Sequence, residues 1–251
     1  MKRWTLVLAA AALVCGLPVQ GQEEEGETGA AEAWVYSTYF VCDITRQEEV
    51  DEVVDSVLAP LWDAAVTGGE ISAWGWLEHH TGGPWRRALY TVGGDRDALM
   101  ATLDGLNGTV GEDEAAALFG EICNSHSDYL WKMGASSEQS AAEAPGAAGL
   151  SVYLECDMTE EAFADVLVET FFAPVFNAHV GEDGLTSWSW LQHEVGGEYR
   201  RLLAMRAGDN GALLSAWDAI LAELEASHGG ALRNFSRICG SHADYLWATH
   251  R

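Results

Sequence analysis

The strongest constraint on the fold is a stretch of sequence that occurs twice, 114 positions apart. The first copy runs from Trp74 to Arg87 (WGWLEHHTGGPWRR) and the second from Trp188 to Arg201 (WSWLQHEVGGEYRR). Residues 71–90 and 185–204 are identical at nine of twenty aligned positions, where unrelated segments would share about one or two at average residue usage. The chain is therefore one module written twice.

Length and charge limit the function classes that fit the chain. It has 251 residues, of which 48% are hydrophobic, so it can close a substantial core. Its net charge is −26 at pH 7, and binding to DNA, RNA or an anionic membrane surface would need a positive field instead. A strongly acidic surface is typical of salt-rich habitats, and it also serves simply as a solubility device.

Residues 1–21 have the pattern of a secretory signal peptide. Lys2 and Arg3 precede an apolar run that ends at Val14 and is too short to span a bilayer. We expect cleavage near Gly21 and a periplasmic or secreted mature protein, whose net charge falls from −26 to −28 when Lys2 and Arg3 are removed. The alternative is a lipoprotein anchored at Cys15, although Val14 is bulkier than the residue that normally precedes such a cysteine.

Two segments of low complexity separate the predicted modules from each other and from the signal. Residues 22–33 (QEEEGETGAAEA) are acidic and lack large apolar side chains, which predicts a flexible tether. Residues 134–149 (GASSEQSAAEAPGAAG) have the composition of a flexible linker. The modules are therefore expected at 34–133 and 150–251.

Each module is predicted to contain the same elements in the same order. An opening strand is followed by a helix that kinks or ends near a proline, then by a hairpin that turns at a Gly-Gly pair, a second helix capped by aspartate, and a last helical segment. In the two copies these are the strands 35–42 and 150–156, the prolines Pro60 and Pro174, the turns Gly82-Gly83 and Gly196-Gly197, the caps Asp95 and Asp209, the helices 98–106 and 212–224, and the last segments 122–131 and 238–247. The hairpin turn places Glu78 opposite Arg87, and His79 opposite Arg86.

The resulting β-α-β-β-α-α order predicts an α+β fold of two tandem ferredoxin-like modules that pack sheet to sheet. This arrangement resembles the dimeric α+β-barrel superfamily, which includes antibiotic-biosynthesis monooxygenases, EthD-like and NIPSNAP-like proteins, and it implies an intramolecular barrel. The copies differ from that superfamily because they are expected to end on a helix instead of a strand. Since the two repeats would cover each other, a monomer is expected.

After removal of the signal, four cysteines remain: Cys42, Cys123, Cys156 and Cys239. An even number in an exported protein predicts disulfides, for which three pairings are possible. Because the cysteines occupy equivalent positions, the economical choice is Cys42 with Cys123 and Cys156 with Cys239. A redox or metal-thiolate role is disfavoured because the chain has no Cys-x-x-Cys motif.

Matched histidines and arginines are the candidate polar site residues. His79 and His193 are candidate catalytic bases at the rim of a cavity between the modules, with Arg86 and Arg200 beside them to hold an anion. The alternative for these residues, and for Arg87 and Arg201, is that they form cross-strand pairs and have no role at a site. His126 and His242 are expected on the apolar face of the last helix, as hydrogen-bonded core residues. No metal motif is present, so neither a metal nor a cofactor is expected.

The aromatic residues offer a second set of candidates. Trp74 and Trp76 alternate along one strand, as do Trp188 and Trp190, so each pair shares a sheet face; they form either the core under the helices or an apolar pocket between the modules. If Cys42 pairs with a helix, Tyr39, Val41, Tyr153 and Glu155 face the other module and become the likelier cavity residues.

These observations leave three functions open. The leading hypothesis is an exported protein that binds a small hydrophobic or anionic ligand between its modules. The second is a cofactor-independent oxygenase or isomerase that uses His79 or His193 as a base, as the superfamily resemblance implies. The third is a structural envelope protein with no ligand.

Overall fold

The computed structural model describes residues 32–137, 147–181 and 184–251. The proposed signal peptide, most of the tether and the middle of the linker lie outside these residues. Contacts within the chain separate Met1–Ala31 from a compact unit, Glu32–Arg251.

Eight antiparallel strands form a closed barrel in the order β1-β3-β2-β8-β5-β7-β6-β4. The strands are β1 (Trp34–Val41), β2 (Ala73–Thr81), β3 (Arg87–Gly93), β4 (Ser125–Ser136), β5 (Ala148–Glu155), β6 (Leu185–Gly196), β7 (Arg201–Ala207) and β8 (Ser241–Thr249). The two halves of the chain meet where β2 pairs with β8 and where β4 pairs with β6. Closure removes every unpaired sheet edge.

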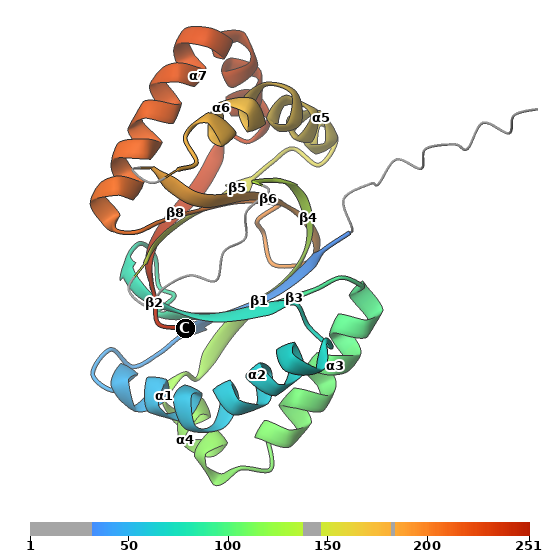
Figure 1. Cartoon of the computed structure of the whole chain (residues 1–251), viewed down its shortest axis with the longest axis vertical. Coiled ribbons are helices and arrows are strands. Elements are labelled where there is room, and N and C mark those ends of the chain that lie inside the picture. Colours follow the sequence, from blue (N-terminus) through green and yellow to red (C-terminus); the bar gives the residue numbers. More distant parts are fainter. Residues whose placement is uncertain (1–31, 138–146, 182–183) are drawn as a thin grey trace, which may run out of the picture. The chain divides into compact units, whose positions relative to one another are not determined.

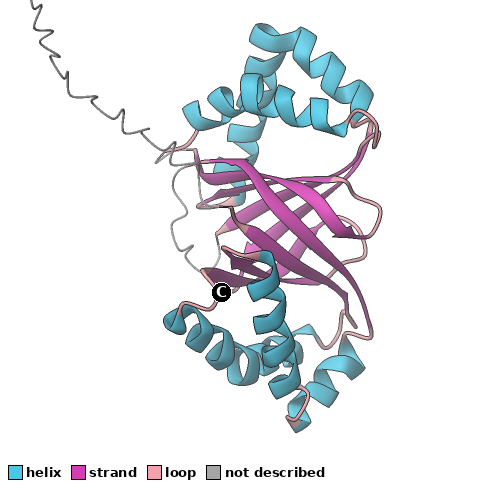
Figure 2. Ribbon diagram, turned by 90° about the vertical axis from the view of Figure 1, so that its right-hand side faces the viewer, coloured by secondary structure: helices cyan, strands magenta, loops and turns pink. Residues whose placement is uncertain are grey.

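Helices cover the outside of the barrel on two opposite sides (Figures 1 and 2). One side carries α1 (Gln47–Val53), η1 (Val54–Leu58), α2 (Ala59–Gly68), α3 (Arg96–Val110) and α4 (Glu114–Ile122), and the other carries α5 (Glu161–Leu167), η2 (Val168–Phe172), α6 (Ala173–Ala178) and α7 (Asn210–Ile238). Within residues 32–137, 147–181 and 184–251, no helix combines the length and apolar character that crossing a bilayer would need.

Neither proline ends its helix, contrary to one of the two predicted outcomes. Residues 47–68 are helical throughout, and the π-helical turn η1 lies just before Pro60. The second half repeats this arrangement, with η2 just before Pro174. Proline has no N–H to donate to the preceding turn, and a widened turn accommodates its ring.

The hairpins and helix caps follow the predictions. Glu78 pairs with Arg87 and Gln192 with Arg201, while the carboxylates of Asp95 and Asp209 accept from the amides of Ala98 and Ala212. The turn glycines Gly82 and Gly196 have φ values of +137° and +130°. A Cβ at either position would also lie 2.6 or 2.4 Å from a backbone oxygen of the other half, so only glycine fits where the halves join.

The last element of each half is a strand, so the prediction of a helix there was wrong. Helix α4 ends at Ile122 and α7 at Ile238, and β4 and β8 follow. Ile122, His126 and Leu130 are four residues apart, which suits a helix, but both faces of the strand are buried near its centre: Tyr129 and Trp131 face the barrel interior and Leu130 faces the helices. A strand covered on both sides has no alternating pattern.

Two disulfides join Cys42 to Cys123 and Cys156 to Cys239, as predicted. Each ties the residues that follow an opening strand to the end of the helix before the last strand. Disulfides are typical of proteins in oxidising compartments.

Candidate functional site

The barrel interior is closed at one end by aromatic rings. The Trp85 ring stacks between Tyr39, at 4.4 Å between centroids, and Tyr245, at 4.9 Å. The rings of Tyr129 and Trp131 also stack, as do those of Tyr245 and Trp247. The indole N–H groups of Trp131 and Trp247 are buried there.

A cavity of about 140 Å³ lies inside the barrel beyond these rings. It is lined by apolar, hydroxyl-bearing and one charged side chain: Val35, Ser37, Tyr39, Leu77, Ala88, Tyr90, Val92, Met133, Ser151, Tyr153, Ser187, Ser189, Leu191, Leu202, Ala204 and Arg206. Tyr39 and Tyr153 are buried, whereas Tyr90, Ser187 and Arg206 are half-buried. The cavity therefore opens at the end where β1 and β5 begin.

Tyr39, Tyr153 and Glu155 are the predicted site residues of the opening strands. Tyr39 and Tyr153 line it, with ring centroids 5.2 Å apart, and the alternating residues Phe40 and Leu154 face the helices. The predicted orientation of the opening strands is thus confirmed for this pair. Glu155 does not line the cavity: it is exposed at the end of β5 and accepts a hydrogen bond from Ser241.

Burial raises the pKa of both cavity phenols. Burial is the largest cause for Tyr39, partly offset by hydrogen bonding from Tyr153 and Ser37, and the pKa of Tyr153 is raised well above its ordinary value, chiefly by burial and then by Tyr39. Both phenols therefore stay neutral near pH 7 and act as hydrogen-bonding groups.

Arg206 is the charged residue among the described residues that line the cavity. Its Nη1 donates to Thr249 Oγ1 over 3.2 Å, and its guanidinium carbon lies 5.5 Å from the centroid of the Tyr90 ring. Arg206 could not be singled out from the repeat, because its counterpart 114 residues earlier is Val92. Only its lack of a match in the first copy could have drawn attention to it.

His79, His193, Arg86 and Arg200 lie at the closed end and do not line the cavity. The His79 ring packs against Tyr245 and Trp247 at 6.3 and 6.1 Å between centroids. Nη1 of Arg86 lies 2.9 Å from His79 Nδ1, and Nη1 of Arg200 lies 2.7 Å from His193 Nδ1. Burial and the Arg86 charge lower the pKa of His79. The structure keeps each predicted pair together, but away from the cavity.

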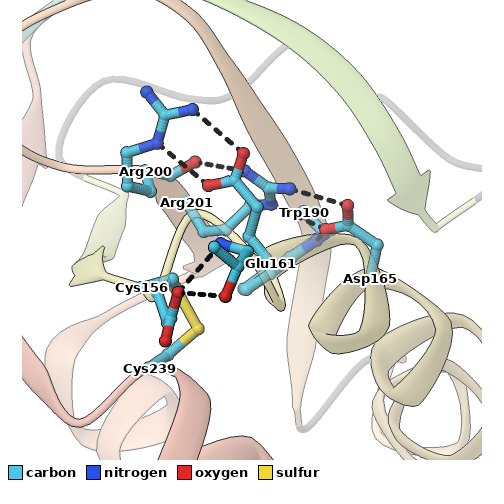
Figure 3. Close-up of a disulfide and its surroundings, with 9 residues drawn as sticks. Cys156, Glu161, Asp165, Trp190, Arg200, Arg201 and Cys239 are labelled. Carbon is cyan, nitrogen blue, oxygen red and sulfur yellow. Dashed lines mark hydrogen bonds and ion pairs between the residues drawn. A yellow bond between two sulfur atoms is a disulfide. The ribbon is translucent and has the colours of Figure 1, made fainter.

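Arg87 and Arg201 lie under the helices instead of at a cavity rim. Arg87 bonds both carboxylate oxygens of Asp51, at 2.7 and 2.6 Å, and Arg201 does the same to Asp165. Figure 3 shows the second network, in which Glu161 also binds Arg200 through two hydrogen bonds of 2.9 Å. Buried arginines held in this way support the fold, because loss of the carboxylate would leave a buried charge unpaired.

The four tryptophans of β2 and β6 lie on the sheet face that the helices cover. Trp76 belongs to the core under α1–α4, with Trp74 packed against it, and Trp188 and Trp190 belong to the core under α5–α7. The indole N–H of Trp76 donates to Asp51 and that of Trp190 to Asp165. The hypothesis that these four residues form an apolar pocket between the halves was therefore wrong, and the core alternative is correct.

His126 and His242 are exposed strand residues, not buried helical ones. Their side chains are 52% and 53% exposed. Alternate residues of a strand share a face, so His126 Nδ1 lies 2.9 Å from Asp128, and His242 lies 3.5 Å from Asp244. On a helix these aspartates would have pointed elsewhere, as we expected.

The first of these pairs, His126 and Asp128, lies beside a pocket. A space of about 310 Å³ between β1, β4 and the helices is lined by Tyr36, Thr38, Phe40, Leu58, Trp62, Leu89, Asn107, Val110, Ala116, Phe119, His126 and Asp128. Burial and the Asp128 carboxylate raise the pKa of Tyr36. In the second half, Leu150 and Val152 replace Tyr36 and Thr38 and belong to the core.

One group of side chains in the described ranges could approach a metal ion. Asp51, Glu78 and His250 offer ligand atoms within 4.8 Å of one another. Asp51 already accepts two hydrogen bonds from Arg87, and His250 Nδ1 lies 2.7 Å from Glu78. The guanidinium thus supplies the positive charge that a metal would bring, and the absence of a metal stays a prediction.

This chain resembles known proteins in its fold. No family model matches the sequence, and no curated protein matches it. Solved structures do match. One is a protein of Lactobacillus acidophilus provisionally named a monooxygenase, with a TM-score of 0.57 at 8% identity over 87% of this chain and 94% of that one. An anthrone oxidase-like protein has a TM-score of 0.53 at 12% identity over 88% and 92%.

A variant of the chlorite dismutase of Candidatus Nitrospira defluvii also has a TM-score of 0.53, at 8% identity, over 87% of this chain and 91% of that one. At these identities the similarity concerns the fold alone. The predicted resemblance is thereby confirmed at that level: the chain has the fold of monooxygenase-like and chlorite dismutase-like dimeric α+β-barrel proteins.

Proposed function

We propose that the protein binds one small, partly apolar molecule inside the barrel. The observation that carries this proposal is the cavity itself, which combines apolar side chains such as Leu77 and Leu191 with the hydroxyls of Ser37, Ser151 and two phenols. Ligand sites are typically apolar and contain a few well-placed polar groups. A volume of about 140 Å³ is close to that of an engineered cavity that accepts one benzene ring.

The composition of the lining favours binding over acid–base catalysis at this site. Among the described residues that line the cavity, none is His, Cys, Asp or Glu, and these are the residues most often used as general bases. The two buried phenols stay protonated near pH 7 because burial raises their pKa.

We also infer that the two halves are ferredoxin-like modules fused in tandem, and that the mature protein is exported and monomeric. The strand order β4-β1-β3-β2 of the first half recurs as β8-β5-β7-β6 in the second. Export is supported by the two disulfides and by the signal-like pattern of residues 1–21.

The experiment uses benzamide as a neutral probe of ring size and follows tryptophan fluorescence. Ala88 and Leu202 are equivalent cavity residues of the two halves. Ala88→Leu therefore places in the first half the side chain that the second half already carries, and it fills part of the cavity. We expect the natural protein to bind benzamide and the variant to bind it at least tenfold more weakly.

Leu202→Ala is the matched control, because it enlarges the same cavity. It should keep or improve benzamide binding at some cost in stability. Equal binding by all three proteins, or no binding by any, would contradict a ligand site in the barrel and leave the structural role ahead. Native mass spectrometry of the protein purified from its own host then identifies the natural ligand class as an added mass.

A second candidate function rests on the pair His126–Asp128. The imidazole is exposed at the edge of the pocket under α3 and α4, and its Nδ1 lies 2.9 Å from the carboxylate. A carboxylate that orients an imidazole is a recurrent arrangement for a general base. This geometry favours His126 over His79 or His193 for the cofactor-independent oxygenase or isomerase alternative.

Oxygen consumption with an anthrone as substrate tests the enzymatic alternative. His126→Gln should abolish turnover, whereas the control His242→Gln changes the equivalent residue of the half that has no such pocket among those found, and should leave turnover unchanged. No turnover by the natural protein, or equal loss in both variants, would count against this candidate.

A further inference from the structure

The cavity changes from symmetric to asymmetric along the barrel. In the deepest layer the first half contributes Tyr39, Ala88 and Leu77, and the second half contributes their counterparts Tyr153, Leu202 and Leu191. In the outermost layer the first half places Val35, Val92 and Ala73 side by side, and the second half places Gly149, Arg206 and Ser187 in the same register. The outermost layer thus holds three small or apolar residues in the first half, where the second half has a glycine, the guanidinium of Arg206 and the hydroxyl of Ser187.

We infer that the barrel site takes a small monocarboxylate whose apolar part enters the cavity and whose carboxylate is bound by Arg206 at the open end. This inference rests on the proposed function and adds the chemical class of its ligand. Arginine presents its N–H groups in a planar fork that matches a carboxylate. Ser187 lies directly across from Arg206 on the neighbouring strand and can donate a further hydrogen bond.

Gly149 leaves room for the guanidinium of Arg206. It pairs with Arg206 across β5 and β7, and a Cβ at Gly149 would lie 3.2 Å from Arg206 Nη1 and 3.4 Å from its Cδ. The equivalent pair of the first half, Val35 with Val92, leaves no such room. The Arg206 side chain therefore lies over Gly149, where any larger residue would crowd it.

Tyr90 holds the guanidinium from the opposite half of the barrel. Its ring lies over Gly75, where a Cβ would come within 2.5 Å of the ring atoms. The centroid of the same ring lies 5.5 Å from the guanidinium carbon of Arg206. Thr249 accepts from Arg206 Nη1 on a third side. Such contacts fix the orientation of a guanidinium before a ligand arrives, which lowers the entropic cost of binding.

Charge sets this position apart from the rest of the protein. The chain carries a net charge of −26, and a field of that sign repels anions from most of the surface. The described cavity lining has one cationic side chain and no carboxylate. The ligand is accordingly one ring or a short chain in size, with its single negative charge at one end.

The test compares benzoate with benzamide, which have the same shape and differ by one charge. Binding is measured by tryptophan fluorescence at pH 7 and low ionic strength for the natural protein, Arg206→Gln and Arg206→Lys. We expect the natural protein to prefer benzoate at least tenfold, Arg206→Gln to lose that preference while it still binds benzamide, and Arg206→Lys to keep part of it. Arg233→Gln removes an equal charge from the exposed surface of α7 and should change nothing.

The outcomes separate this inference from the proposed function. If benzamide binds and benzoate binds no better, or if the preference survives Arg206→Gln, the carboxylate assignment is wrong and the ligand site in the barrel stands. If neither compound binds the natural protein, both fail together. Retained benzamide binding by Arg206→Gln shows that the variant is folded, so loss of selectivity in that variant has one explanation.

Discussion

The two ends of the barrel interior differ in how closely the residues of the first half match those of the second. At the closed end, Tyr39, Tyr129 and Trp131 of the first half correspond to the identical residues Tyr153, Tyr245 and Trp247 of the second. At the open end, Val92 corresponds to Arg206 and Tyr90 corresponds to Ala204. A closed barrel needs its rings in both halves, whereas a ligand with one charged end needs one cation. Symmetric residues therefore belong to the scaffold, and asymmetric ones are where specificity is expected.

Truncating the closed end should have the largest effect. Trp131 and Trp247 are 0% and 1% exposed, and replacing a fully buried tryptophan by alanine costs about 3–5 kcal/mol. We expect Trp131→Ala and Trp247→Ala to lower the free energy of unfolding by equal amounts, measured by urea denaturation, with Val195→Ala, an exposed residue of β6, as the control. A clearly unequal loss would break the symmetry argued for this end.

The buried arginines predict a slightly smaller and unequal effect. Asp51→Ala leaves Arg87 buried without a carboxylate, a change that costs about 3 kcal/mol or more. In the second half, Arg201 Nη1 also lies 3.3 Å from Glu161, while the counterpart of Glu161 is the neutral Gln47. Asp165→Ala should therefore cost less than Asp51→Ala in urea denaturation. The double variant Asp165→Ala with Glu161→Gln should remove that difference, and if it does not, Glu161 has no compensating role.

Repetition explains what could be predicted from the sequence. The matched Gly-Gly turns, aspartate caps and cysteines led to the hairpins, helix starts and disulfides that the structure contains. The last strand was missed because Tyr129 and Leu130 are both buried, on opposite faces, which leaves no alternation to read. The face of the tryptophans was undecided for a related reason: both faces of β2 and β6 are covered, and strand periodicity cannot say which cover is which.

The candidate site could be predicted only where it repeats. Tyr39 and Tyr153 followed from the alternation of the opening strands once the cysteines were paired. Arg206 carries no such signal, since its importance comes from standing over Gly149 and opposite Tyr90. His79 and Arg86 were candidates because they recur at His193 and Arg200, and recurrence turned out to mark the closed end of the barrel.

A substitution at the open end should have an intermediate effect. In Gly75→Ala the new methyl group would lie 2.5 Å from the Tyr90 ring, so the ring must move, at a cost of about 1–3 kcal/mol. Because Tyr90 lines the cavity and contacts Arg206, the variant should also bind benzamide more weakly. Gly208→Ala, at an exposed position where an added Cβ would meet no atom within 4 Å, is the control and should change neither quantity by much. Unchanged binding in Gly75→Ala would mean that Tyr90 does not shape the cavity.

The smallest effect concerns a pH dependence that involves His250 of the second half and acidic residues of the first half. Burial alone lowers the pKa of His250, but hydrogen bonds to Glu78 and Asp55 and the charge of Asp51 outweigh it and raise this pKa above its ordinary value. The folded protein then holds the proton more tightly than the unfolded chain. The stabilisation is therefore fully present below about pH 6.5, the ordinary histidine value, and is lost as pH rises through the folded value.

His250→Gln removes this contribution. The position of the first half that corresponds to His250 is Gly134, so no matching contribution exists there. The difference in unfolding free energy between the natural protein and the variant should be larger at pH 5.5 than at pH 8.5, by less than about 1 kcal/mol because the imidazole is partly exposed. His80→Gln, at an exposed histidine of the first half, serves as the control in urea denaturation at both pH values. A difference that grows towards pH 8.5 would reverse the sign and show that Glu78 and Asp55 do not hold the charged form.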